Sequence, residues 1–209
     1  MKYNTVLFDF DGTIADTLPH IVTIVKRNAH QYSSIDPETI DIEHSRSLSS
    51  VEILKYFKIP VYKLPFIINQ IRSEIYNHIA DVKPFPFIIP LFNEMNKLST
   101  TMGIVSSNTL DTVQAFLTNH NLNNFTYIRC EQNIFGKPAV LKSLIHTQSL
   151  SAQSILYVGD EVRDIDACKK VGIDIAAVTW GFSTKSALTQ KNPTYVVDSE
   201  EQLLQIIKN

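Results

Sequence analysis

The sequence has few cysteines and no long hydrophobic run. Only two cysteines, Cys130 and Cys168, occur in 209 residues, and they form no CxxC or Cys/His spacing, which argues against structural zinc and against a disulfide framework. No segment approaches the run of about 18 apolar residues that a membrane-spanning helix needs, and the N-terminus does not have the pattern of a signal peptide. We therefore expect a cytoplasmic protein that does not associate with a membrane.

The chain also lacks an excess of one charge. Its 19 basic and 21 acidic residues leave a formal net charge of -2, so the basic surface that nucleic acid or an anionic membrane would require is missing. At 44% hydrophobic and 19% charged residues, the chain can bury a sizeable core in one domain or in a domain with a small appendage. The near-neutral surface favours a monomer over an oligomer.

Short β-rich runs alternate with segments of helical periodicity. The runs are near-continuously apolar, which is typical of a parallel sheet covered by helices on both faces. We predict an α/β fold with ligands at the carboxyl ends of the strands. The expected strands lie within residues 3–10, 100–108, 125–131, 154–160, 174–180 and 194–199, and the expected helices within residues 90–99, 110–120, 139–148 and 164–172.

This alternation is interrupted between Asp16 and Lys83, where only helical patterns occur. These patterns cover residues 20–32, 50–57 and 66–80, with start signals at Ser50 and at Ser33 or Ser34. The prolines of residues 82–90 predict a stiff, extended return linker. We therefore predict a core formed by residues 1–16 and 84–209, with residues 17–83 as an inserted helical cap.

The stretch DFDG places Asp9 and Asp11 two positions apart after the first expected strand. If strand geometry continues through them, both carboxylates emerge on the same side. One carboxylate can then attack a phosphoryl group, while the other protonates the leaving oxygen and later deprotonates a water molecule. The alternative interpretation is a surface turn in which aspartate is a turn former.

Further polar residues follow other expected strands. Ser106, Ser107 and Asn108 offer hydroxyls and an amide that suit phosphate oxygens without adding charge, although such a triplet is also common as a loop and helix cap. Lys137 lies between a glycine and a proline that would fix its loop. Taken alone, such a lysine is ordinarily a solvated charge.

Two more carboxylates, Asp160 and Asp164, lie in the stretch GDEVRD after another expected strand. If Asp164 lies in the first turn of the following helix, its carboxylate can face back toward the strand ends. Four carboxylates around one pocket would repel one another and a phosphate. A hard cation with oxygen ligands is therefore needed, and Mg²⁺ fits best, with Lys137 offsetting the remaining charge.

The set DFDGT, SSN, GKP and GDEVRD, in this order, resembles the four signature motifs of the haloacid dehalogenase-like hydrolase superfamily, in its phosphoglycolate phosphatase-like branch. The resemblance covers nearly the whole chain. It implies a Rossmann-like core with a helical cap inserted after the first strand, and an enzyme that hydrolyses a small-molecule phosphate ester with Mg²⁺ as cofactor.

Carried over by position, the resemblance also implies a role for each motif residue. Asp9 would be the nucleophile and Asp11 the general acid and base. The transferring phosphoryl group would be bound by Ser106, helped by the backbone of Ser107 and the side chain of Asn108. Lys137 would neutralise the phosphate and orient Asp9. Mg²⁺ would be bound by Asp160, Asp9 and the backbone carbonyl of Asp11. Asp164 would bind it directly or through water.

Substrate choice is expected to depend on the cap. Arg46, in the stretch EHSRSLSS, is the residue best able to hold a substrate carboxylate or a second phosphate, unless it is a solvated arginine in a helix-capping loop. Two other functions stay open: a phosphomutase of the β-phosphoglucomutase type, and a receiver-like phospho-acceptor module without enzymatic activity. The receiver has less support, because it needs neither a DxDG stretch on the first strand nor a helical insertion.

Overall fold

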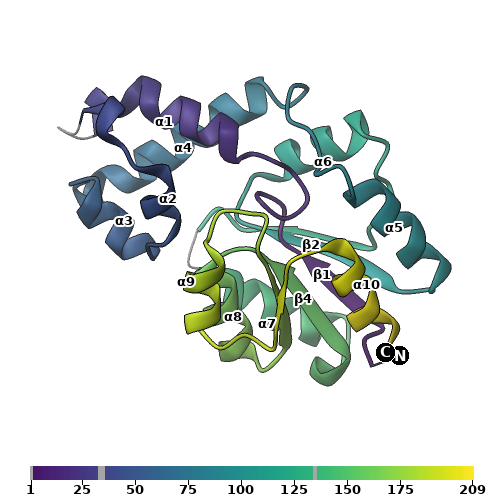
Figure 1. Ribbon diagram of the computed structural model, residues 1–209. Helices are drawn as coiled ribbons and strands as arrows, with labels where there is room; N and C mark the ends of the chain where they lie inside the picture. Colours follow the sequence, from purple (N-terminus) through teal and green to yellow (C-terminus); the bar gives the residue numbers. More distant parts are fainter. Residues whose placement is uncertain (1, 33–35, 134–135) are drawn as a thin grey trace.

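A computed structural model describes residues 2–32, 36–133 and 136–209. Six parallel strands form one sheet in the order β3-β2-β1-β4-β5-β6 (Figure 1). This arrangement confirms the predicted α/β class, because every expected run contains one strand. The strands are β1 (Thr5–Phe8), β2 (Thr101–Ser106), β3 (Tyr127–Cys130), β4 (Ile155–Gly159), β5 (Asp174–Val178) and β6 (Tyr195–Val197).

Helices cover both faces of this sheet, as the apolar runs predict (Figure 1). Side chains alternate along β1, so that Val6 and Phe8 belong to one buried cluster and Leu7 to the other. The first cluster includes side chains of α5 (Ile88–Lys97), α6 (Leu110–Asn119) and α10 (Glu200–Lys208), and the second includes side chains of α7 (Lys137–Thr147), α8 (Val162–Val171) and α9 (Lys185–Gln190).

Four helices between β1 and α5 lie together to one side of the sheet (Figure 1). They are α1 (Leu18–Tyr32), α2 (Ile42–Arg46), α3 (Ser50–Tyr56) and α4 (Leu64–Asn77), with 3₁₀ turns at Pro37–Thr39 and Val61–Lys63; a third such turn, Ala152–Ser154, precedes β4. This group is the helical cap of the predicted fold class, and we call it the cap below. The exact limits of residues 17–83 stay a prediction.

The two chain segments that join the cap to the core run side by side. The Asp16 N–H donates to the Lys83 carbonyl at 2.9 Å, and the Phe85 N–H donates to the Ile14 carbonyl at 3.1 Å. These bonds pair the exit from the first strand with the return to the sheet. The cap is therefore attached through one double connection.

The structure corrects three local predictions. Ser49, not Ser50, is the N-cap of α3, while Ser33 and Ser34 lie outside the described residues. The extended return linker ends before Pro86, because Pro86 and Phe87 form a turn, α5 begins at Ile88 and Pro90 belongs to its first turn. The helices α2, α9 and α10 were not predicted.

Within the described ranges, no helix combines the length and apolar character that a bilayer-spanning segment requires.

Candidate active site

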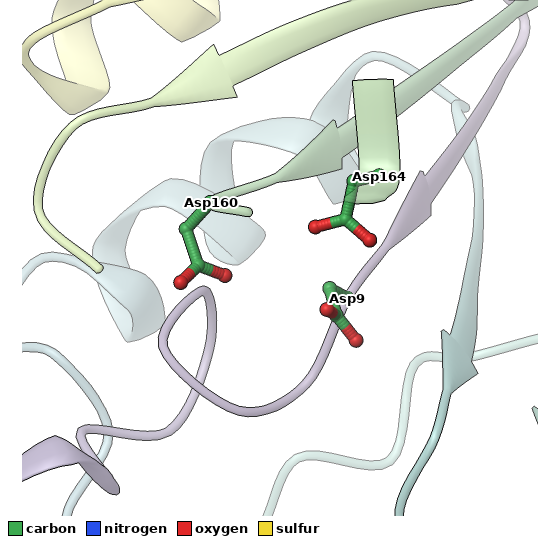
Figure 2. Close-up of side chains that lie close together, drawn as sticks. All are labelled: Asp9, Asp160 and Asp164. Carbon is green, nitrogen blue, oxygen red and sulfur yellow. The ribbon is translucent and has the colours of Figure 1, made fainter. Parts of the chain in front are cut away.

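Three buried carboxylates meet at the carboxyl ends of two neighbouring strands. Asp9 follows β1 and Asp160 follows β4, and these two strands are paired in the middle of the sheet. Asp164 lies in the first turn of α8, as the sequence predicts. The three side chains lie close together (Figure 2), and one oxygen from each lies within 4.8 Å of the others. This arrangement brings together residues up to 155 positions apart in sequence (164 minus 9).

Lys137 supplies a positive charge to this cluster from the first turn of α7. Its ammonium lies 2.8 Å from Asp9 Oδ2 and 2.5 Å from Asp164 Oδ1, and 5.3 Å from the centre of the Tyr157 ring. Burial by itself would lower the pKa of Lys137, but the two carboxylates raise it above its ordinary value. The lysine is therefore charged, and one ammonium faces three acids.

The repulsion among the three carboxylates contributes to the raised pKa values of Asp9 and Asp160. Burial raises the pKa of Asp9 to about 7, with Lys137 opposing this effect and Asp164 adding to it. Burial, together with the charges of Glu161, Asp9 and Asp164, raises the pKa of Asp160 well above its ordinary value. A bound divalent cation that prefers oxygen ligands would stabilise the ionised forms of Asp9 and Asp160. The residues present therefore fit a metal ion of this type.

Asp160 is held by two loops that both need glycine. Thr13 Oγ1 donates to one carboxylate oxygen at 2.6 Å, and the Phe182 N–H donates to the other at 2.6 Å. A Cβ atom on Gly12 would lie 2.3 Å from the Asp160 carboxylate, and one on Gly181 would lie 2.2 Å from it. Gly12 also has φ +74°, a conformation that residues with a side chain rarely adopt. The glycine of DFDG therefore permits the approach to Asp160.

Asp11 occupies a different environment from Asp9. The condition that strand geometry continues through both residues is not met, because β1 ends at Phe8. The Asn108 side-chain amide donates to Asp11 Oδ2 at 3.0 Å, whereas the buried Asp11 Oδ1 makes no well-formed hydrogen bond in the described structure, and the Thr17 hydroxyl is close enough to interact with the Asp11 carboxyl. Burial raises the pKa of Asp11. One oxygen is thus fixed, and the other is available for a proton.

The residues at the end of β2 form the wall next to Asp11. Ser106 is buried, and its hydroxyl accepts a hydrogen bond from the Asn108 N–H at 2.9 Å. The following residue, Thr109, is the N-cap of α6. The N-cap of the helix is thus Thr109, which follows the Ser-Ser-Asn triplet. The triplet itself lies next to Asp11 in the candidate active site.

Two arginines that the sequence did not single out also reach this wall. Arg163 pairs with Glu161, and its guanidinium lies 3.3 Å from the Ser107 hydroxyl. Arg72 extends from α4 of the cap and donates to the carbonyls of Ser107 and, at 2.8 Å, Gln132. Arg163 lies within the quoted GDEVRD stretch, but Arg72 has no sequence signal, because it lies in an ordinary helical pattern.

Arg46 contacts the core instead of solvent. Its Nε donates to the Phe182 carbonyl at 3.1 Å, one terminal nitrogen donates to the Gly181 carbonyl at 2.8 Å, and the other contacts Glu43 at 2.6 Å. The interpretation of Arg46 as a solvated arginine is therefore wrong. Its use in binding substrate stays a prediction, and its contacts in the structure join α2 to the loop that holds Asp160.

The sequence model of haloacid dehalogenase-like hydrolases matches residues 6–178. This range contains every candidate residue of the site. The chain belongs to the haloacid dehalogenase-like hydrolase family. Membership confirms the resemblance drawn from the four motifs.

Relatives within this family are phosphatases. A phosphoglycolate phosphatase from Synechococcus elongatus is 28% identical over 203 residues, covering 97% of this chain and 96% of the relative. A pyrophosphatase PpaX from Oceanobacillus iheyensis is 27% identical over 222 residues, covering 99% and 98%. The predicted enzyme class, a haloacid dehalogenase-like phosphatase, is thereby confirmed.

Solved structures share the fold over its full length. A predicted phosphatase from Clostridium acetobutylicum superposes with a TM-score of 0.81 at 19% identity, covering 100% of this chain and 99% of the other. A haloacid dehalogenase-like family hydrolase from Streptococcus pneumoniae gives 0.70 at 20% identity, covering 98% of each chain. At these identities the likeness concerns the fold alone.

Proposed function

We propose that this haloacid dehalogenase-like phosphatase hydrolyses a small phosphomonoester through an aspartyl-phosphate on Asp9, with Mg²⁺ as cofactor. The observation that supports this most directly is the difference between the two aspartates of DFDG. Asp9 is paired with Lys137 in the carboxylate cluster, whereas Asp11 lies outside that cluster and accepts a hydrogen bond from the neutral amide of Asn108. A nucleophile and a proton carrier need these two environments.

In the first step, a carboxylate oxygen of Asp9 attacks phosphorus, and the bond from phosphorus to the ester oxygen breaks. Asp11 gives its proton to the leaving oxygen, so that a neutral alcohol departs. Burial raises the pKa of Asp11, which favours the protonated form that this step requires. Lys137 offsets the charge that collects on Asp9 and the phosphoryl group.

In the second step, a water oxygen attacks the same phosphorus atom. The ionised Asp11 takes the proton of this water, and the bond between phosphorus and Asp9 breaks. Asp9 recovers its carboxylate, and inorganic phosphate leaves. Ser106, Ser107 and Asn108 would donate hydrogen bonds to the phosphoryl oxygens during both steps.

The metal ion would be held by Asp9, Asp160 and Asp164, together with the backbone carbonyl of Asp11. When bound, Mg²⁺ would neutralise negative charge on the phosphoryl oxygens. The choice of Mg²⁺ follows from the all-oxygen donor set. Thr13 and the Phe182 N–H keep Asp160 oriented for this purpose.

The variant Asp9→Asn tests the assignment of the nucleophile. We expect its kcat to fall on the order of 10⁴-fold or more, because an amide cannot form the covalent intermediate. The matched control is Asp16→Asn, which changes the third acid of the same stretch and should leave kcat within about twofold, since Asp16 lies outside the cluster. A chelator should abolish turnover and added Mg²⁺ should restore it. Comparable activity of Asp9→Asn and the control would contradict the assignment.

Release of inorganic phosphate separates hydrolysis from phosphomutase activity. A phosphatase releases one phosphate for each alcohol formed, whereas a mutase returns the phosphoryl group to a substrate and needs a bisphosphate activator. Phosphoglycolate and pyrophosphate, named for the relatives, belong in the first substrate panel. Equal amounts of alcohol and phosphate are the result that supports the proposal.

A further inference from the structure

A cavity of about 390 Å³ extends from the candidate active site into the cap. One end is polar and includes Asp11, Ser107 and Asn108. The cavity therefore begins at the proposed proton carrier and at the wall that would hold the phosphoryl group. Since Asp11 would protonate the leaving oxygen, the rest of the cavity is the space for the leaving group.

That space is lined by apolar side chains of three cap helices. On α4, Leu64, Ile68 and Ile71 recur at helical spacing, and on α1, Val22 and Val25 do the same. Leu54 and Ile53 of α3 complete this part of the lining. The apolar residues of α1 and those of α4 belong to two helices that contact each other. A cavity is nevertheless left between these two helices.

The arginines around the cavity are already occupied. Arg46 binds the carbonyls of Gly181 and Phe182, and Arg72 binds the carbonyl of Ser107 together with that of Gln132. These bonds remove the groups that would best recognise a carboxylate or a second phosphate on a substrate.

Two other cations line the cavity. Arg163 is paired with Glu161. Lys26, on α1, has no hydrogen bond or ion pair within the described residues. Lys26 is thus the one free cation of the described lining, and it follows Val25 directly.

We propose that the leaving group of the substrate is apolar, so that the enzyme acts on the phosphate ester of a medium-chain aliphatic or an aromatic alcohol. This inference rests on the proposed function, because it assigns the alcohol part of the same ester. Cavities that bind drug-sized ligands begin at about 300 Å³, so a two-carbon acid would leave most of the apolar wall uncovered. A carboxylate placed against that wall would also lose hydration, and Lys26 is the one free cation of the described lining that could pair with it.

A series of straight-chain alkyl phosphates, from methyl to octyl, tests this inference on the unaltered protein. We expect kcat/KM to rise by up to about fourfold for each buried methylene until the cavity is filled. Phosphoglycolate and pyrophosphate should fall below hexyl phosphate. A kcat/KM that is flat or falls with chain length would overturn the inference, as would a higher value for phosphoglycolate or pyrophosphate. Failure of the proposed function has a different result, since no ester would then be hydrolysed, methyl phosphate included.

A pair of variants on α4 locates the effect. Ile68→Trp fills the cavity, whereas Asn69→Trp adds the same side chain to an exposed position of the same helix. Ile68→Trp should lower the ratio of octyl to methyl kcat/KM on the order of tenfold, and Asn69→Trp should leave this ratio unchanged. If Ile68→Trp does not fold, as judged by its Tm, Val25→Phe replaces it. Equal ratios in the folded cavity variant and its control would overturn the inference.

Discussion

Lys137 is held in place by several groups of the site. Its ammonium is buried between Asp9 and Asp164, and buried charges are tolerated only when they are paired. The ring of Tyr157 lies below it, and the Tyr157 hydroxyl donates to the Val105 carbonyl at 3.0 Å. The lysine is thus fixed from several sides, which suits a group that would orient a nucleophile.

Asp174 offers a test at the residue scale that is independent of catalysis. Partial burial works to raise its pKa, but hydrogen bonds from Lys2, Tyr3 and Thr194 outweigh burial and leave the pKa below its ordinary value of 3.8. A lowered carboxyl pKa stabilises the folded state above pH 3.8, and this contribution is lost as the pH falls through the lower, folded-state value. The side chain is 30% exposed, so we expect about 1 kcal/mol or less.

Urea unfolding as a function of pH measures this contribution. The free energy of unfolding of Asp174→Asn should fall less steeply below pH 3.8 than that of the unaltered protein. Asp111→Asn, at an exposed position of α6, is the matched control and should follow the unaltered protein. If all three proteins have the same pH dependence, the hydrogen bonds to Asp174 do not contribute.

Single residues could be predicted from the sequence where they follow a strand in a recognisable motif. Asp9 and Asp160 are of this kind, and the structure brings them together. Arg72 and Tyr157 could not be predicted, because Arg72 meets Ser107 across 35 positions and Tyr157 contacts Val105 across 52. Such contacts depend on tertiary packing, which no local pattern records.

At the scale of elements, the start of α3 is fixed by a capping box. The Ser49 hydroxyl accepts from the Glu52 N–H at 3.4 Å, and the Glu52 carboxylate accepts from the Ser49 N–H at 2.8 Å. These reciprocal bonds satisfy two donors that the first turn of a helix leaves open. The helix contributes Leu54 to the cavity wall, so its stability affects the proposed leaving-group space.

Ser49→Ala should therefore reduce the free energy of unfolding by about 1 kcal/mol. Ser73→Ala is the matched control, since Ser73 is exposed within α4; it should be neutral or slightly stabilising, because alanine favours the helix interior. Chemical denaturation of both variants provides the measurement. An equal loss in the two variants would show that the capping box has no stabilising effect.

The elements were predictable where a pattern is long or strongly apolar. All six strands lie within the expected runs, whereas the five-residue α2 is too short for its periodicity to be read. Pro90 suggested extended chain, but proline is tolerated in the first turn, where N–H groups lack helical partners. The N-cap of α3 was predicted at Ser50 but is Ser49. Both residues are serine, so the sequence alone does not distinguish them, and the backbone conformation decides which one is the cap.

At the scale of the whole molecule, two arginines connect the cap to the core. Arg46 reaches the loop of Gly181 and Phe182, and Arg72 reaches the carbonyls of Ser107 and Gln132. Both sets of contacts lie beside the candidate active site. The position of the cap relative to the core therefore depends on charged hydrogen bonds, which are stronger than neutral ones.

Replacing Arg72 tests this coupling. Arg72→Met removes two charge-assisted bonds while keeping an apolar side chain, and we expect kcat/KM to fall by roughly tenfold. Arg27→Met is the control within the cap, because Arg27 pairs with Glu74 but is 59% exposed and such surface pairs contribute little. If both variants retain the unaltered kcat/KM, the Arg72 contacts between cap and core do not contribute to turnover.

The helical insertion between the first and second strands was accessible from the sequence, because the predicted alternation of strands and helices is interrupted between Asp16 and Lys83. The cavity was not accessible in this way. Its walls come from α1, α3 and α4, and its existence depends on how far apart these helices pack. Periodicity identifies the apolar stripe of each helix but does not indicate a space between two stripes.

Identification of the phosphorylated residue would establish whether Asp9 is the nucleophile. The variant Asp11→Asn should accumulate the intermediate, because it lacks the base for the second step; an activated aryl phosphate with Mg²⁺ avoids the need for an acid in the first. Acid quenching, borohydride reduction and peptide mass mapping would then reveal where the phosphoryl group was attached. We expect conversion of Asp9 to homoserine only when substrate is present. Modification of another residue, or an unmodified Asp9 in a variant that still releases the alcohol, would contradict it.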